Sequence, residues 1–161
     1  MFAKGYDDSN GYYEGEKLNG KKHGVGTFFN QNGDRYDSEW FEDKVQGLGQ
    51  ISFLNGDVYT GQFQKDKEHG IGRIEFSLGG KKGGGNVYEG MWKNGKGIGQ
   101  GRYIYGGSEQ MIYEGEVWNC EPYGLGQYKS PDFIYEGEFK YGEFEGIGRL
   151  YNLKLDTLYD G

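Results

Sequence analysis

The chain has 161 residues, 33 of them glycine, 17% of them aromatic, and a formal net charge of −7. Two prolines and the lack of a Gly-X-Y period exclude collagen, and the aromatic content excludes a flexible linker. Aliphatic residues are too few for a thick globular core, and no apolar run is long enough to span a membrane.

A tyrosine-glycine repeat organises nearly the whole sequence. Residues 1–12 precede it and are expected to act as an N-terminal cap. From Tyr13 onward the unit Tyr-x-Gly, with Ser38 in place of one glycine, returns at spacings of 23, 23, 29, 25, 22 and 24 residues. A period of this length indicates a repeat architecture. The predicted units are 13–35, 36–58, 59–87, 88–112, 113–134 and 135–158, and residues 159–161 begin an incomplete one.

Each unit has the pattern of a β-hairpin. Tyr59, Gly61 and Phe63 alternate with polar residues, which is typical of a half-buried strand. Gly70, Gly72 and Ile74 alternate in the same way after a polar turn. Six hairpins predict an all-β fold: a single-layer, elongated, twisted antiparallel sheet of twelve strands, resembling a solenoid.

A second signature, glycine-aliphatic-glycine, begins eleven residues after most of the tyrosines, as in Gly24-Val25-Gly26. In the fourth unit Gly97-Ile98-Gly99 begins only nine residues after Tyr88, so we expect a shorter turn there. The third unit carries an insertion over residues 78–87, which we expect to form an exposed loop.

Two patterns resemble enzyme motifs but recur with the repeat. Gly-x-x-x-x-Gly-Lys begins at Gly15 and Gly90, without the Ser or Thr that a P-loop needs next. Pairs such as Glu136 and Glu138 have about the separation used by inverting glycosidases. Because an active site is normally unique, repetition favours a solvent-exposed face. We therefore expect no enzyme activity, no catalytic residue, no cofactor and no small-molecule substrate.

The residues that could bind a metal are separated by the repeat. His23 and His69 occupy equivalent positions two units apart, which places them about 19 Å apart in the expected sheet. Cys120, the single cysteine, falls at a hairpin turn and suits a reducing compartment. We expect no metal site.

Charge is distributed unevenly along the chain. Residues 1–58 carry 6 basic and 10 acidic residues, residues 59–112 carry 8 and 5, and residues 113–161 carry 4 and 10. The overall acidity argues against nucleic acid as a partner. The basic middle predicts a patch for an anionic partner, formed by Lys81, Lys82, Lys93, Lys96 and Arg102.

The pattern Tyr-x-Gly-x-(Trp/Phe), a polar turn and then Gly-x-Gly resembles the MORN (membrane occupation and recognition nexus) repeat, in six copies over residues 13–158. Lys17 and Val117 depart from it at the aromatic position, and Ser38 departs at the first glycine. The resemblance implies tandem hairpins in an extended, grooved sheet. It also implies a role in ciliary axonemes, cytoskeletal scaffolds or membrane junctions.

These observations lead to a functional hypothesis. We expect a non-enzymatic scaffold that binds protein partners through an aromatic groove and open sheet ends, as a subunit of a ciliary axonemal or cytoskeletal assembly in the cytoplasm. The alternative is a peripheral membrane module that binds anionic phospholipid weakly through the basic central units. The expected groove residues are Trp40, Tyr59, Phe63, Tyr88, Trp92, Tyr113, Tyr135 and Phe139.

Overall fold

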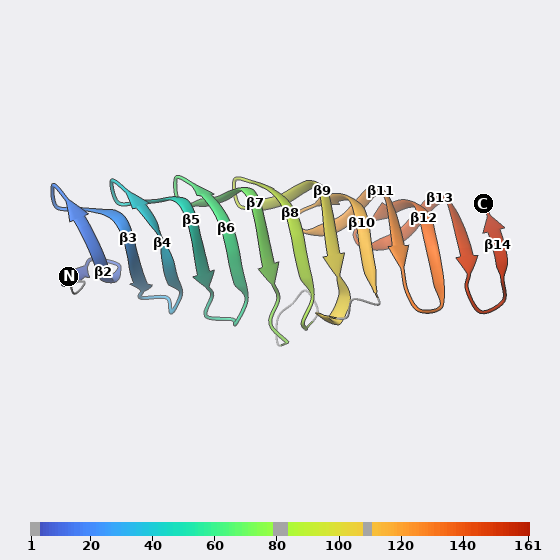
Figure 1. Ribbon diagram of the computed structural model, residues 1–161, viewed down its shortest axis with the longest axis horizontal. Coiled ribbons are helices and arrows are strands. Elements are labelled where there is room, and N and C mark those ends of the chain that lie inside the picture. Colours follow the sequence, from blue (N-terminus) through green and yellow to red (C-terminus); the bar gives the residue numbers. More distant parts are fainter. Residues whose placement is uncertain (1–3, 79–83, 108–110) are drawn as a thin grey trace.

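The computed structural model describes residues 4–78, 84–107 and 111–161. Within them, fourteen strands form one antiparallel sheet in which each strand pairs with its neighbours in sequence. Figure 1 shows the strands side by side along the long axis, with β2 and β14 towards opposite ends. The expected all-β, single-layer sheet of tandem hairpins is confirmed.

The sheet has two more strands than the expected twelve, because β1 pairs with β2 and β14 pairs with β13. One 3-10 turn, η1 (Tyr105–Gly107), follows β9. The strands are β1 (Lys4–Asp8), β2 (Gly11–Leu18), β3 (Lys21–Asn30), β4 (Arg35–Phe41), β5 (Lys44–Ser52), β6 (Val58–Gln64), β7 (Lys67–Glu75), β8 (Val87–Lys93), β9 (Lys96–Ile104), β10 (Ile112–Trp118), β11 (Glu121–Lys129), β12 (Phe133–Lys140), β13 (Glu143–Asn152) and β14 (Thr157–Asp160).

The turn inside each repeat is a two-residue loop with positive φ at both positions. Asn19 and Gly20, for example, have φ of 52° and 79°. Turns of this kind match the right-handed twist of the flanking strands. Each turn begins six residues after the repeat tyrosine. The segment from the tyrosine to the turn therefore has the same length in all six hairpins. The six turns are Asn19–Gly20, Glu42–Asp43, Lys65–Asp66, Asn94–Gly95, Asn119–Cys120 and Tyr141–Gly142.

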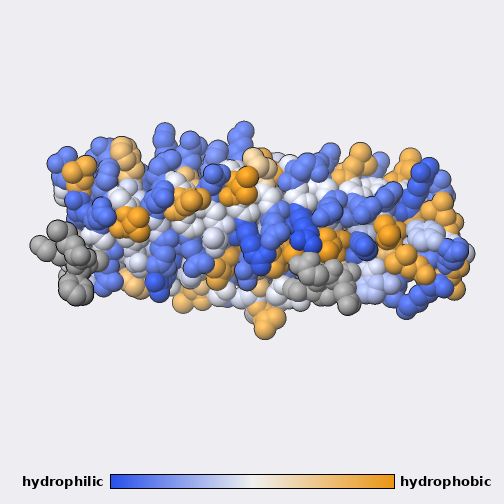
Figure 2. All heavy atoms as spheres, viewed as in Figure 1, coloured by the Kyte–Doolittle hydropathy of each residue, from blue (hydrophilic) through white to orange (hydrophobic). Residues whose placement is uncertain are grey.

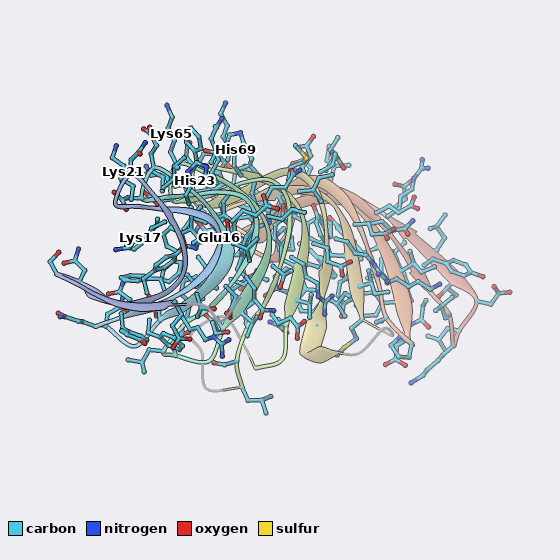
Figure 3. All side chains as sticks on the ribbon, turned by 60° about the vertical axis from the view of Figure 1, so that its left-hand side comes forward. Glu16, Lys17, Lys21, His23, Lys65 and His69 are labelled. Atoms are coloured by element: carbon cyan, nitrogen blue, oxygen red, sulfur yellow. The ribbon has the colours of Figure 1, made fainter. Side chains whose placement is uncertain are left out.

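A bulge bends the second strand of each hairpin beside this turn. In the first hairpin, one residue between Gly15 and Lys17 faces the three residues between Lys22 and Gly26. Gly24 lies within the bulge at φ 64°, a conformation that favours glycine. The first glycine of the Gly-x-Gly signature therefore makes the bulge. Figure 3 shows the resulting arch of the strands.

The expected shorter turn in the fourth unit is wrong. Its bulge glycine is Gly99, at φ 73°, and Gly101 pairs with Gly90 as Gly26 pairs with Gly15. Gly99-Gln100-Gly101 thus takes the place of the signature at the ordinary spacing of eleven residues. Gly97 forms an additional Gly-x-Gly with Gly99, and this one begins two residues before the signature at the bulge. Unit lengths differ instead in the loops between hairpins.

The core consists of tyrosine rings laid over glycine pairs. The Tyr59 hydroxyl donates to the Gln62 carbonyl at 2.9 Å, which draws the ring across Gly61 and Gly72. A Cβ at Gly72 would stand 2.3 Å from the Tyr59 oxygen. Tyr13, Tyr59, Tyr88 and Tyr113 are all fully buried. A sheet one layer thick can bury these rings because it arches around them.

Successive hairpins are joined by rings and by turn hydrogen bonds. Tyr59 contacts Trp92 of the next hairpin edge-on at a centroid distance of 4.8 Å. At the turns, the Asp43 amide donates to the Lys22 carbonyl, and the Lys22 amide donates to Asp43 Oδ1 at 2.8 Å. Equivalent backbone bonds join later turns to the preceding hairpin. These contacts join each hairpin to the next along the whole sheet.

The insertion after the third hairpin is only partly described. Residues 79–83 of the expected exposed loop lie outside the described residues. At its borders, Leu78 is exposed, whereas the Asn86 side chain donates to the Tyr103 hydroxyl and accepts from the Gly106 amide.

Candidate interaction surface

The rings expected to line a partner groove form the core instead. Every one of them is at most 7% exposed, and each packs against glycines or other rings. The arch of the sheet closes over this face, so the rings have little area left for a partner. The groove prediction is therefore corrected for Trp40, Tyr59, Phe63, Tyr88, Trp92, Tyr113, Tyr135 and Phe139.

The expected basic patch is not one surface. Lys81 and Lys82 lie outside the described residues. Lys93 and Lys96 face each other at the hairpin tip. Arg102 lies six residues further along β9, where its guanidinium is 3.8 Å from Glu89 and 3.5 Å from Glu114. Its charge is thus balanced by carboxylates at a distance from the two lysines.

The repeated carboxylate pairs have structural partners. Glu39 Oε2 accepts from the amide of Leu48 in the bulge at 3.1 Å, and Gln62 does the same for Ile71 at 2.8 Å. Glu138 lies over the equivalent bulge glycine, whereas Glu136 accepts from Gln127 on the neighbouring strand. The third residue after the tyrosine therefore covers the bulge.

The histidines sit at the bulges of the first and third hairpins, and Figure 3 shows both near the tip edge. His23 lies 5.2 Å from the Phe41 ring, measured between centroids. Among the described residues, no group of three or more His, Cys, Asp or Glu could hold a metal ion. Cys120 is buried at the fifth turn, where its amide donates to the Gly97 carbonyl.

The face opposite the rings, called here the outer face, carries two rows that run along the rod. The polar row consists of the residue after each repeat tyrosine and the residue paired with it. Six of its members are acidic and three are basic. The row is Glu14, Thr27, Asp37, Gln50, Thr60, Arg73, Glu89, Arg102, Glu114, Gln127, Glu136, Arg149 and Asp160.

The second row, called here the aliphatic row, is the middle residue of Gly-x-Gly. Val25, Leu48, Ile71, Leu125 and Ile147 are 68%, 59%, 68%, 61% and 73% exposed. In the fourth hairpin Gln100 takes this place and interrupts the row. Figure 2 shows hydrophobic residues at intervals along the rod among hydrophilic ones. Each hairpin except the fourth therefore presents an aliphatic side chain to solvent.

An open groove of about 780 Å³ lies between the two rows over β2–β6. Its floor is the backbone of Gly15, Gly26, Ser38, Gly49 and Gly61. A Cβ at Gly15, Gly26 or Gly61 would point towards a tyrosine ring, and one at Gly49 would meet the Ser38 side chain. Val25 and Leu48 form one wall, and residues of the polar row form the other. Because no side chain of these residues projects onto the outer face, the floor of the groove is open backbone.

Smaller hollows repeat on the other side of the aliphatic row. One contains Val25 and Trp40, the next contains Leu48 and Phe63, and a third contains Leu125 and Phe139. Each is bounded by a bulge glycine, its neighbouring aliphatic residue and an aromatic residue of the next hairpin. At the first, second and fifth hairpins, the exposed aliphatic residue thus forms a ridge beside a hollow.

Sequence reasoning missed this surface because it followed the aromatic residues. The signal was present: an aliphatic residue between two glycines lies on the strand face opposite the tyrosine. An apolar residue repeated on that face, without an apolar neighbour to cover it, indicates an exposed row.

Comparison with known families gives one match. A family model of the MORN repeat matches residues 13–35, 36–58, 59–81, 88–108 and 135–151, which is more than half of the chain. The unit 113–134 is not matched, although β10 and β11 form a hairpin with the same turn and bulge. No curated protein matches the sequence. No helix in the described ranges has the length and apolarity needed to cross a bilayer.

Proposed function

Because the chain belongs to the MORN-repeat family, we propose that it is a non-enzymatic scaffold that holds protein partners on its outer face and at the open edges of its sheet. MORN repeats are interaction modules for proteins or membrane lipids. The proposed partner surface is the outer face, and not the face on which the buried rings lie.

The aliphatic row is the observation that carries this proposal. Single exposed apolar residues are ordinary on soluble proteins, but this row places them at a fixed interval on a continuous sheet. Glu39 and Gln62 lie beside Val25 and Leu48 on the intervening strands, so the row offers regularly spaced apolar contacts. Val25, Leu48 and Ile71 are each more than half exposed, and none of them belongs to the ring core. Their positions suit a partner that is itself periodic.

We further propose that the scaffold works in a ciliary axonemal or cytoskeletal assembly in the cytoplasm. The support is by analogy with proteins built almost wholly of these repeats. The elongated sheet suits such a setting because it offers several equivalent binding positions along one rod.

The test is purification of the tagged full chain from ciliated cells, with partners identified by mass spectrometry. The paired variant Leu48→Ser with Ile71→Ser removes the centre of the aliphatic row. Leu54→Ser is the matched control, because Leu54 is 74% exposed on a loop between hairpins. Partners lost with the pair and kept with the control would support docking on the outer face. Recovery of no partner by the unaltered chain would overturn the scaffold proposal.

The membrane alternative has a different surface. The hairpin tips of the first, third and fourth units expose Lys21, Lys65, Lys93 and Lys96, and Figure 3 shows the first two at the tip edge. Each basic residue near an anionic membrane contributes about 1 kcal/mol. Lys21→Glu with Lys65→Glu should then abolish sedimentation with phosphatidylserine vesicles. Equal sedimentation of the variant and the unaltered chain would reject this alternative.

A further inference from the structure

We propose that the N-terminal half of the outer face binds a basic amphipathic α-helix that lies along the rod, with its apolar stripe on Val25, Leu48 and Ile71. This inference rests on the scaffold proposal and names the chemistry of the partner.

The spacing of the aliphatic row fits a helix. Equivalent residues of successive hairpins are two strands apart, or about 9.6 Å. Seven residues of an α-helix rise about 10.5 Å and return to nearly the same face. Over the two intervals from Val25 to Ile71, the mismatch adds up to only about 2 Å, which side-chain rotation accommodates. A helix with an aliphatic residue at every seventh position therefore meets each ridge in turn.

The hollows beside the row supply the complementary shape. The hollow at Val25 also contains Phe41, and the next one, at Leu48, also contains His69. Both lie between successive hairpins, so they repeat at the same interval as the ridges. A helix presents further side chains three and four residues from its main stripe. These side chains would enter the hollows while the main stripe contacts the ridges.

Charge on this half of the face selects a basic partner. Glu14 and Asp37 line the groove from the polar row, and Glu39 lines it beside Leu48. Asp37 is already paired with Arg35 at 2.8 Å, so Glu14 and Glu39 supply the negative charge that a basic partner would meet.

No basic residue is among the described residues that line this groove. Arg73, the polar-row residue on the strand of Ile71, is paired with Glu75 and Glu89. A second copy of the chain in the same orientation would bring the carboxylates of the groove against one another, which is unfavourable. Lysine and arginine beside the apolar stripe would instead lie over the carboxylates.

Gln100 sets the limit of the site. It interrupts the aliphatic row after the third hairpin, because a polar side chain takes the place that Val25, Leu48 and Ile71 hold in the first three hairpins. A helix that contacts the three exposed aliphatic residues, one in each heptad, is about three heptads long.

Other extended partners fit less well. A β-strand rises about 3.3 Å per residue, so the nearest match to the ridge spacing is three residues, which places successive contacts on opposite faces. A polyproline helix has a suitable rise, but its grooves are normally lined by aromatic rings. The described lining of this groove contains no aromatic residue.

The test uses the full chain and a synthetic peptide of three heptads. Its leucines recur at every seventh position, and lysine and arginine flank them. Control peptides have the same composition with irregularly spaced leucines, glutamate in place of the basic residues, or a proline-rich sequence. Binding is measured by fluorescence anisotropy, and helix formation by circular dichroism.

The unaltered chain should bind the first peptide and make it helical. Leu48→Ser with Ile71→Ser should weaken binding about tenfold or more, since truncation of a central interface residue commonly has this effect. Leu54→Ser should not. Glu14→Gln should weaken binding a few-fold and reduce its dependence on salt, whereas Glu42→Gln, at a hairpin tip, should leave both unchanged.

Three outcomes would overturn the inference: no binding of the first peptide, equal binding of the irregular peptide, or insensitivity to Leu48→Ser with Ile71→Ser. Preference for the proline-rich peptide would also overturn it. The scaffold proposal is decided separately, by recovery of partners with the unaltered chain. If partners are recovered and cross-link elsewhere, the helix inference alone fails.

Discussion

The Tyr59 ring lies so close to Gly72 that a Cβ on the glycine would stand 2.3 Å from the phenolic oxygen and 2.6 Å from the ring carbons. The same relationship joins Tyr13 to Gly26, Tyr113 to Gly126 and Tyr135 to Gly148. Glycine is required here by ring contact and not by backbone conformation, because positive φ occurs at the bulge glycine two residues earlier. The two glycines of one signature thus serve different physical needs.

Gly72→Ala should destabilise the protein by about 1–3 kcal/mol, since the methyl group must displace a packed ring. Urea-induced unfolding followed by circular dichroism measures this difference. Tyr59→Leu removes the ring, so Gly72→Ala should have a much smaller effect in that background. Equal effects in both backgrounds would show that the ring contact is not the cause.

Ser38→Gly should stabilise the second hairpin. Ser38 replaces the glycine of Tyr-x-Gly, and its buried hydroxyl oxygen has no hydrogen-bond partner among the described residues. The serine side chain fills the space over Gly49, and Tyr36 is only partly buried, unlike Tyr13 and Tyr59. Glycine would allow the Tyr36 ring to fold inward, with an expected net gain of about 1 kcal/mol after the entropic penalty of glycine.

Thermal unfolding measures the stability of this variant, and tyrosine fluorescence quenching measures the exposure of Tyr36. Ser38→Ala is the matched control, because it removes the hydroxyl but keeps the Cβ that blocks the ring. If alanine gives the same gain and the same Tyr36 exposure as glycine, the argument from ring placement is incorrect.

Much of this fold follows from local sequence rules. Alternation of Tyr59, Gly61 and Phe63 identifies a strand, and the polar turn after it identifies the hairpin. The fourth unit is ambiguous in sequence because Gly97, Gly99 and Gly101 form two overlapping Gly-x-Gly signatures. Only the pairing of Gly101 with Gly90 identifies the right one. Strand register depends on such cross-strand contacts, which a single sequence does not display.

The surface was harder to predict than the fold. Aromatic residues at alternating positions indicate a face, but burial depends on how strongly the sheet arches, and the bulge at Gly70 supplies that arch. Once the rings are enclosed, Leu48 and Ile71 become the apolar residues that a partner can reach. Arg102 illustrates the same limit, because its carboxylate neighbours come from two adjacent strands.

Glu39→Ala should destabilise the protein by about 1 kcal/mol, because the Leu48 amide loses its hydrogen-bond acceptor in the bulge. Glu39→Gln should be nearly neutral, since Gln62 accepts from the Ile71 amide in the equivalent place. Chemical unfolding of the two variants measures the difference. A large loss with glutamine would mean that the negative charge, rather than an acceptor oxygen, is needed.

The buried tyrosines should make the fold sensitive to alkaline pH. Burial, with a smaller contribution from Glu16, raises the pKa of Tyr13 to about 12, and burial, with a smaller contribution from Glu116, raises the pKa of Tyr113 to about 12. Burial also raises the pKa of Tyr59 and Tyr88. An unfolded tyrosine titrates near pH 10. The folded state therefore holds its phenolic protons at a pH where the unfolded chain has released them.

The sign of the effect follows from this difference. The free energy of unfolding keeps its full value below about pH 10. It falls as the pH rises from about 10 to about 12, by roughly 1–3 kcal/mol for each buried ring. Urea unfolding across this range should show the midpoint falling, and phenolate absorbance should appear together with unfolding. Tyr113→Phe removes one such group, so its stability should fall less steeply with pH even if it is lower at neutral pH. Constant stability up to pH 12 would contradict the assignment of these rings as a protonated core.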